Sequence, residues 1–291
     1  MPFPFSFRLP EDVRNFLRAA LREDVGIGDI TSGLTIPEDH VSSAVIISKE
    51  DGVIVAGLPF AKEIFTLMDP EVRFRRQARD GEMVNKGDVI AKVKGLTISL
   101  LASERVALNI LQRLSGIATL TRRFAEELEG TSAKITDTRK TTPNMRYMEK
   151  YAVRVGGGVN HRFGLYDGIL IKDNHVKAAG GVAKAVKLAK KAMHLHKIEV
   201  EVEDLAGFEE ALEAGADVIM LDNMPIEKAA AAVRLNEEKS RALGRARAVI
   251  EASGNITLQN VRQVGETGVD LISSGSITHS YKAADLSMEI E

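Results

Sequence analysis

The sequence contains no cysteine among its 291 residues. This absence excludes disulfide bonds, cysteine nucleophiles and thiolate-ligated metal sites, and it fits a reducing compartment. No segment approaches the ~18 consecutive apolar residues of a membrane span, and residues 1–14 lack the basic and apolar pattern of a secretion signal. We therefore expect a soluble, cytoplasmic protein.

The sequence also lacks an excess of either charge. It has 39 Lys and Arg against 41 Asp and Glu, a formal net charge of -2. This balance gives no global electrostatic reason to bind nucleic acid or an anionic membrane, so we expect neither as a partner. Any strong anion site must be local. Apolar residues make up 44%, which is ample for a core, and the length suits one large α/β domain or a barrel with a smaller domain.

The first third of the chain has a mixed α/β pattern. The expected elements are a helix at 11–23, strands at 43–48 and 72–76, a turn at 85–88 in which Gly87 takes positive φ, and amphipathic helical stretches at 98–116 and 119–129. Gly130 is the expected stop of the last stretch. We expect the first domain boundary within these helices.

From residue 133 onward, short runs rich in β-branched residues alternate with helical stretches, which is the βα pattern of a parallel sheet. The expected strands are 135–138, 169–172, 198–202, 218–221, 248–252 and 271–273, and the expected helices are 178–192, 205–214, 226–243 and 258–264. Gly215-Ala216-Asp217 and Gly268-Val269-Asp270 each close a helix and open a strand, a repeated unit typical of β/α barrels.

Polar residues follow nearly every one of these strands. They are Arg139, Lys140, Lys172, Glu201, Asp222, Ser253 and Ser274. In parallel α/β folds the carboxyl ends of the strands face the ligand cavity, so the pattern predicts one pocket fed by many strands. The alternative, that strand ends are simply solvated, stays open at this stage.

Cationic residues gather in three of these places, at 138–143, 156–162 and 172–175, and Arg105 joins them from the preceding helix. Arginine forks bind carboxylate or phosphate in a bidentate way, and lysine acts as a point charge. Each cation alone is best interpreted as half of a surface ion pair. Together, at strand ends, they favour a pocket for a ligand with several anionic groups.

Small residues and carboxylates complete the predicted pocket. Backbone N–H groups of Ser253-Gly254-Asn255 and Ser274-Gly275-Ser276, after the last two strands, are expected to cradle a phosphate. Glu201 with Asp222 would hold Mg²⁺ or ribose hydroxyls. The alternative is a structural network with Lys140 and Lys172, and both interpretations can hold together.

His161 has two interpretations: a hydrogen-bonding contact with substrate, or a residue whose hydrogen bonds are satisfied within the protein. His161, His175 and Asp173 do not have the spacing of a zinc site, and we predict no zinc.

Several of these segments resemble a known family. They are 104–109, 114–119, 138–143, 156–164, 170–175, 199–203, 252–256 and 278–280. In order, over almost the entire chain, they are similar to the quinolinate phosphoribosyltransferases, the carboxylating nicotinate-nucleotide pyrophosphorylases. The blocks are long and unusual, so the resemblance is highly specific.

The resemblance implies an N-terminal α/β sandwich domain at residues 1–115 and an incomplete β/α barrel at 116–277, with the tail 278–291 packing on the first domain. It also implies a homodimer, with higher oligomers left open, in which the N-terminal domain of one subunit caps the barrel of its partner. Arg105 would then reach into the neighbouring site.

The implied activity is that of a decarboxylating pentosyltransferase of de novo NAD biosynthesis. It joins quinolinate to the ribose of 5-phosphoribosyl pyrophosphate (PRPP) and releases pyrophosphate and CO2, giving nicotinate mononucleotide. The implied ligands of the two quinolinate carboxylates are Arg139, His161 and Arg162. Lys140 and Lys172 would line the anionic pocket, and these two lysines with Glu201 and Asp222 are the expected catalytic residues.

By the same resemblance, Glu201 and Asp222 would serve the ribose and the Mg²⁺ of PRPP, either directly or through PRPP oxygens and water. The loops 253–255 and 274–276 would receive the phosphate of PRPP.

Other functions remain to be distinguished. Nicotinate phosphoribosyltransferase and a protein associated with molybdate transport could share the scaffold, but Arg105, Arg139, Arg162 and the block 172–175 favour a dicarboxylate. From another class, residues 81–95 resemble half of a lipoyl or biotinyl carrier domain. No second half presents a modifiable lysine at a hairpin tip.

Overall fold

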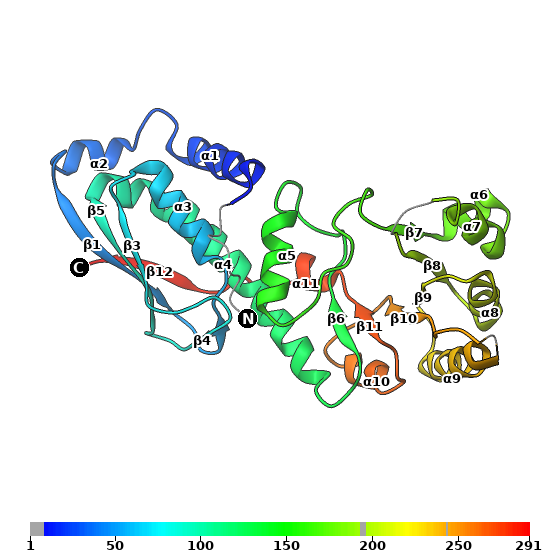
Figure 1. The fold of residues 1–291 in the computed structure, drawn as a ribbon. Coiled ribbons are helices and arrows are strands. Elements are labelled where there is room, and N and C mark those ends of the chain that lie inside the picture. Colours follow the sequence, from blue (N-terminus) through cyan, green and yellow to red (C-terminus); the bar gives the residue numbers. More distant parts are fainter. Residues whose placement is uncertain (1–8, 193–195, 243) are drawn as a thin grey trace. The chain divides into compact units, whose positions relative to one another are not determined.

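The computed structural model describes residues 9–192, 196–242 and 244–291 (Figure 1). The first eight residues, on which part of the expectation about a secretion signal rests, lie outside this range. The chain divides into two compact units. One comprises the residues up to 120, 142–156 and 281–291, and the other comprises 121–141 and 157–280.

The first unit contains an antiparallel sheet of four strands in the order β12-β1-β5-β3. Its elements are α1 (Glu11–Val25), α2 (Ile30–Thr35), β1 (Val41–Ser48), β2 (Val53–Ile54), α3 (Leu58–Met68), β3 (Arg73–Arg76), β4 (Met83–Val84), β5 (Val89–Leu96), the first part of α4 (Thr97–Glu127), α5 (Arg146–Val155) and β12 (Leu286–Ile290). Burial alternates along β1, so one face of the strand packs into the core. The C-terminal strand β12 pairs with β1 and completes the sheet.

Helix α4 is one continuous helix of 31 residues, not two stretches separated after Gly116. Gly116 is tolerated inside the helix because the chain at Lys282 and Ala283 crosses directly over it. A Cβ at Gly116 would come within 2.2 Å of the Lys282 carbonyl oxygen. Close backbone approach therefore explains this glycine, which does not break the helix.

Helix α5 is not among the elements that the sequence predicts. Its Tyr147 and Tyr151 rings pack edge-on against Phe60, with centroids 6.5 and 5.3 Å apart, and the Tyr151 hydroxyl donates a hydrogen bond to Asp80. These contacts explain why residues 142–156 group with the first unit, although the sequence-based boundaries assign them to the barrel domain.

The second unit contains a sheet of six strands in the order β6-β11-β10-β9-β8-β7, and every neighbouring pair is parallel. The strands are β6 (Lys134–Thr136), β7 (Ile169–Ile171), β8 (Ile198–Val202), β9 (Val218–Asp222), β10 (Val249–Ser253) and β11 (Leu271–Ser273). All six predicted strands are confirmed. The edge strands β6 and β7 do not pair with each other, so the barrel is incomplete, as expected.

The helices of this unit, besides the end of α4, are α6 (Asp173–Ala179), α7 (Val182–Ala189), α8 (Leu205–Ala214), α9 (Ile226–Ala242), α10 (Val261–Gly265) and α11 (Ser276–His279). The helix predicted at 178–192 is wrong in its bounds, because Gly180 and Gly181 both take positive φ and separate α6 from α7. Helix α9 matches its prediction, whose last residue, Leu243, lies outside the described residues. Figure 1 shows α7, α8 and α9 side by side along the sheet.

The two faces of this sheet differ in chemistry. Val200, Ile219 and Ile250 are fully buried and apolar, and they alternate along their strands with residues of the opposite face. Paired residues of parallel strands point to the same side, so the register places one set on that opposite face. The set is Glu199, Glu201, Met220, Asp222, Glu251 and Ser253. The sheet therefore presents a carboxylate-rich interior face.

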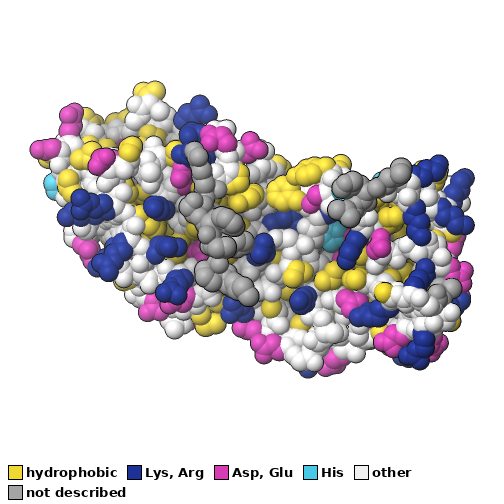
Figure 2. All heavy atoms as spheres, in the orientation of Figure 1, with side chains coloured by type: hydrophobic (Ala, Val, Ile, Leu, Met, Phe, Trp, Pro, Cys, Tyr) yellow, Lys and Arg dark blue, Asp and Glu magenta, His cyan; other side chains and the backbone are white. Residues whose placement is uncertain are grey.

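None of the described helices is both long and apolar enough to cross a bilayer. Basic and acidic side chains are interspersed over the face of the molecule in Figure 2, in agreement with the small net charge.

Candidate active site

The polar residues predicted at strand ends lie at one edge of the second unit's sheet. Arg139 and Lys140 follow β6, Lys172 follows β7, and Ser274 follows β11. Glu201 is the penultimate residue of β8, and Asp222 and Ser253 are the last residues of β9 and β10. Because the strands are parallel, these positions share the carboxyl edge. Arg105 is the exception: it lies in α4 of the first unit, where its side chain is exposed.

Like Arg139, Arg162 is a half-buried cation of this edge. Its Nη1 donates to the carbonyl oxygen of Gly168 at 2.9 Å, and its Nε is buried without a hydrogen-bond partner among the described residues. Burial lowers the pKa of Arg162, and the nearby Arg139 guanidinium lowers this pKa further, whereas Glu199 raises it. Two guanidinium groups with a buried N–H donor still to satisfy form a site for an anion.

Lys172 makes an ion pair with Glu201, with 2.7 Å between Nζ and Oε2. The structural network of lysines and carboxylates that the sequence analysis gave as an alternative therefore exists for Lys172 and Glu201. The backbone N–H of Lys172 donates to Nδ1 of His175 at 2.9 Å, and this contact caps α6 and fixes the start of the helix at Lys172. His175 thus has a structural role in positioning Lys172.

The two small-residue loops lie beside each other and beside Lys140. Ser274 Oγ donates to the Ile256 carbonyl oxygen at 3.3 Å and is 2.7 Å from Ser276 Oγ. A Cβ at Gly275 would lie 2.8 Å from Cδ of Lys140, so glycine is needed for the lysine side chain to cross this loop. These contacts join the chain after β10, β11 and β6 in one corner of the edge.

In the other loop, Gly254 takes φ 95° and Asn255 takes φ 51°. Asn255 Nδ2 donates to Asn223 Oδ1 at 2.9 Å, which links the ends of β9 and β10. This geometry provides a tight turn at the position where the sequence predicts phosphate binding, and that role stays a prediction.

His161 uses both ring nitrogens within the protein. Nδ1 accepts a hydrogen bond from the backbone N–H of Arg162 at 2.8 Å. Nε2 lies 3.1 Å from Glu199 Oε2 and 3.6 Å from Glu251 Oε2. The second sequence interpretation, a residue satisfied by the protein itself, therefore describes this structure, and direct contact with substrate stays a prediction.

Glu199 and Glu251 are the residues of this site that sequence reasoning missed. Both lie in predicted strands, 198–202 and 248–252, but the sequence does not single out either of them as a site residue. The signal for Glu251 is a carboxylate in the middle of Val249–Ser253, a strand whose centre is buried. A buried strand tolerates such a residue only with a partner.

The pKa of Glu251 is raised to about 7, first by burial and then by the charge of Glu199, while His161 and Lys172 act in the opposite direction. Near neutral pH this carboxyl group therefore holds a proton for much of the time. Burial and a neighbouring negative charge both favour the protonated form of a carboxyl group.

The raised pKa of Glu251 predicts a pH-dependent stability. In the folded protein the proton stays on Glu251 up to about pH 7, whereas in the unfolded chain it leaves near pH 4.5. The stabilising contribution is therefore complete below pH 4.5 and is lost as the pH rises through 7. The difference in unfolding free energy between wild type and Glu251→Gln should fall by about 3 kcal/mol over this interval, as measured by urea denaturation. A difference that does not change with pH would contradict this assignment.

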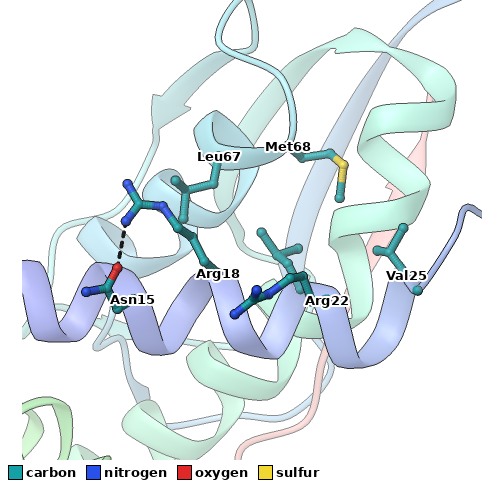
Figure 3. Close-up of a pocket in the computed structure, with 8 residues that line it drawn as sticks. Asn15, Arg18, Arg22, Val25, Leu67 and Met68 are labelled. Carbon is teal, nitrogen blue, oxygen red and sulfur yellow. Dashed lines mark hydrogen bonds between the residues drawn. The ribbon is translucent and has the colours of Figure 1, made fainter.

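Three cavities of the described residues differ in how close they lie to these site residues. A cavity of about 550 Å³ lies in the first unit between α1 and α3, lined by Arg18, Arg22, Leu67 and other residues (Figure 3). No residue that the sequence predicts for the site lines it, and Arg18 is held by Asn15 at 2.8 Å. In the second unit, a cavity of about 400 Å³ includes Glu201, and one of about 190 Å³ includes Ser253, Gly254 and Asn255. The latter two adjoin the carboxyl edge of the sheet.

Comparison with known proteins supports one family over both parts of the chain. The N-terminal domain model of quinolinate phosphoribosyl transferase matches residues 29–115, and the C-terminal domain model matches residues 117–289. The N-terminal match covers residues 81–95, so nothing supports a lipoyl or biotinyl carrier domain there.

Among curated proteins, the chain is 46% identical to a probable carboxylating nicotinate-nucleotide pyrophosphorylase of Bacillus subtilis, covering 96% of this chain and 93% of the relative. It is 44% identical to a decarboxylating quinolinate phosphoribosyltransferase of Nicotiana tabacum, covering 96% and 83%.

Among solved structures, NadC from Streptococcus pyogenes superposes with a TM-score of 0.91 at 44% identity, covering 99% of both chains. Human nicotinic acid phosphoribosyltransferase, with a TM-score of 0.60 and 12% identity over 97% of this chain and 74% of that chain, shares the fold alone. The fold class, the identity over nearly the whole chain and both domain matches agree: the chain belongs to the quinolinate phosphoribosyl transferase family.

Proposed function

We propose that this protein transfers the phosphoribosyl group of PRPP to the nitrogen of quinolinate and releases pyrophosphate and CO2, giving nicotinate mononucleotide for NAD biosynthesis. The observation that carries this proposal is the cationic corner of the carboxyl edge, where Arg162 Nε is buried beside the Arg139 guanidinium with no hydrogen-bond partner in the described part of the chain. Relatives covered over most of their length carry this activity in their names.

Quinolinate binding is assigned to the cations of this edge. Arg139 and Arg162 would bind its two carboxylates, because paired guanidinium groups suit a dicarboxylate better than a monocarboxylate. Lys140 and Lys172 would line the same pocket. Direct contact between His161 and the substrate would require its ring to give up a present partner, so His161 is better suited to supporting Arg162.

PRPP binding is assigned to the remaining parts of the edge. Loops 253–255 and 274–276 would hold its phosphate through backbone N–H groups and hydroxyls. Glu201 and Asp222 fit a Mg²⁺ site, since both lie on the interior face. Glu201 pairs with Met220 of β9, and Asp222 lies two residues further along that strand. Carboxylates at this offset suit Mg²⁺ that also keeps ligands from substrate and water. Bound Mg²⁺ would offset negative charge on the departing pyrophosphate.

The proposed reaction needs no enzyme nucleophile. The pyridine nitrogen attacks C1 of the ribose while the bond to pyrophosphate breaks, and the leaving group takes the electron pair. The lysines stabilise this leaving group. The resulting pyridinium then stabilises the carbanion left at C2 when the bond to the adjacent carboxylate breaks, CO2 departs, and a proton adds at C2. Positioning by the arginines therefore matters more than acid–base catalysis.

We further propose a homodimer with shared active sites. The described residues include large apolar side chains that are almost fully exposed: Ile27 at 105%, Ile30 at 73% and Leu34 at 82% in the first unit, and Leu165 at 74% and Tyr166 at 75% in the second. Exposed apolar clusters of this kind mark interaction surfaces. Arg105, exposed on α4, would serve the partner's site. A cytoplasmic location is proposed with it, since a chain without cysteine suits a reducing compartment.

The function is tested by assaying the purified protein with PRPP and Mg²⁺ and either quinolinate or nicotinate. Nicotinate mononucleotide should form from quinolinate together with one CO2, nicotinate should react at least ~100-fold less efficiently because it lacks one carboxylate for the paired arginines, and chelation of Mg²⁺ should abolish turnover. Faster reaction with nicotinate would instead identify a nicotinate phosphoribosyltransferase.

Arg139→Ala should reduce kcat/KM for quinolinate by at least ~100-fold, because it removes a charge-assisted contact with substrate. Folding should be normal, since the side chain lies at the edge of the sheet and not in the apolar core. Lys187→Ala, which removes an exposed cation on α7, is the matched control and should have wild-type kinetics. Unchanged turnover of quinolinate by Arg139→Ala would exclude this site.

Shared sites predict complementation between two inactive variants. Arg105→Ala and Lys172→Ala each disable every site of their own homodimer, but a mixed dimer contains one site with both wild-type residues. Random reassociation should therefore restore about a quarter of wild-type activity. Recovery of no activity after verified subunit exchange would place Arg105 in the site of its own subunit or outside any site.

A further inference from the structure

His161, Glu199 and Glu251 form a cluster of low exposure, and His161 directly precedes Arg162 in the chain. His161 Nε2 is 3.1 Å from Glu199 Oε2 and 3.6 Å from Glu251 Oε2. Glu199 and Glu251 are 8% and 1% exposed and come from β8 and β10, strands that are separated by β9. A single ring nitrogen therefore contacts carboxylates from two strands that are not neighbours on the interior face.

The hydrogen bonds of the ring fix its tautomer. Nδ1 accepts from the backbone N–H of Arg162, so Nδ1 carries no proton. The proton is then on Nε2, which donates it toward Glu199. His161 therefore connects the carboxylate pair to the backbone of Arg162.

Residues 160 and 161, directly before Arg162, are also held by hydrogen bonds to a buried carboxylate. The buried Asp137, directly after β6, accepts from the backbone N–H of His161 at 2.9 Å and from Asn160 Nδ2 at 2.6 Å. With Asp137 fixing residues 160 and 161, and the imidazole ring fixing the N–H of residue 162, little rotational freedom is left where the Arg162 side chain begins.

The carboxylate pair is costly for folding. Oε1 of Glu199 is buried without a hydrogen-bond partner among the described residues, and the buried Glu251 has the Ser273 hydroxyl beside it. Apolar side chains at these positions would avoid this cost. Costly buried polar groups beside a ligand pocket indicate a functional requirement.

We propose that Glu199 and Glu251 are positioning residues, which act through His161 to hold Arg162 in the orientation that binds a carboxylate of the pyridine substrate. This assignment rests on the proposed function for the identity of the substrate. A divalent metal bound by the same three side chains is disfavoured, because a protonated Nε2 is a hydrogen-bond donor and not a ligand.

The kinetic test compares Glu199→Ala with Glu199→Gln. Alanine removes the acceptor for Nε2–H, so KM for quinolinate should rise about tenfold, with KM for PRPP within ~2-fold of wild type. Glutamine keeps an acceptor oxygen and should recover most of this loss. Glu251→Ala, which removes the other carboxylate beside Nε2, should raise KM for quinolinate in the same direction.

Asp270→Asn is the matched control. Asp270 accepts from the Ile250 backbone N–H and pairs with Arg247 at the amino ends of β10 and β11, the edge opposite the site. This variant should lower the unfolding temperature without changing either KM. Equal changes of both KM values in Glu199→Ala, or no recovery in Glu199→Gln, would overturn the proposal.

A substrate-free measurement separates this proposal from the proposed function. Nitrogen-15 NMR of the full chain, with the His161 signals assigned through His161→Asn, should show Nδ1 without a proton and Nε2 with one at pH 7. Glu199→Ala should shift the Arg162 backbone amide signal, whereas Asp270→Asn should not. A doubly protonated ring, or an Nε2 that binds added Zn²⁺, would overturn the proposal. Failure of the wild type to turn over quinolinate would refute the proposed function without altering this spectrum.

Discussion

Repulsion between cations confined at one edge of a sheet is the constraint on which the rest of this structure depends. Burial lowers the pKa of Arg162, and the Arg139 guanidinium lowers it further, so an anion bound beside both groups would relieve their repulsion. Within the protein this repulsion is offset by carboxylates on the interior face: Glu199 acts on Arg162, and Glu201 pairs with Lys172. A ligand with two carboxylates and several phosphate groups supplies the remaining negative charge.

The fold supports this arrangement by simple topology. Six parallel strands end at one edge, so side chains that are far apart in the sequence meet without long loops. The interior face of an incomplete barrel is also sheltered, which permits Glu199 and Glu251 to lie there at low exposure. An open antiparallel sheet, such as the one in the first unit, would not bring its strand ends together in this way.

The sequence predicted the repetitive parts well. All six parallel strands and α8 were predicted, because local periodicity and flanking glycines determine them. Helix α5 was missed, since its place depends on packing of Tyr147 and Tyr151 on Phe60, which is distant in sequence. The Gly180-Gly181 break was missed because two glycines within an alanine- and lysine-rich stretch were treated as part of a helix.

In the site too, features set by local sequence were predicted and features set by distant contacts were not. Cations and small residues that directly follow strands were identified from position alone. Glu251 was not identified, because its importance arises only when β8, β9 and β10 pair and bring it to Glu199 and His161. The role of His161 also depends on three-dimensional contacts. The sequence shows only that His161 precedes Arg162, whereas the hydrogen bond from the Arg162 N–H determines which ring nitrogen carries the proton.

The central claim is that the buried Nε–H of Arg162 awaits a carboxylate. A crystal structure of the protein with quinolinate bound tests this claim most directly. The account predicts a carboxylate oxygen of quinolinate within hydrogen-bond distance of Arg162 Nε, with the Arg139 guanidinium on the same ligand. Quinolinate bound elsewhere, with Arg162 Nε still lacking an acceptor, would contradict it.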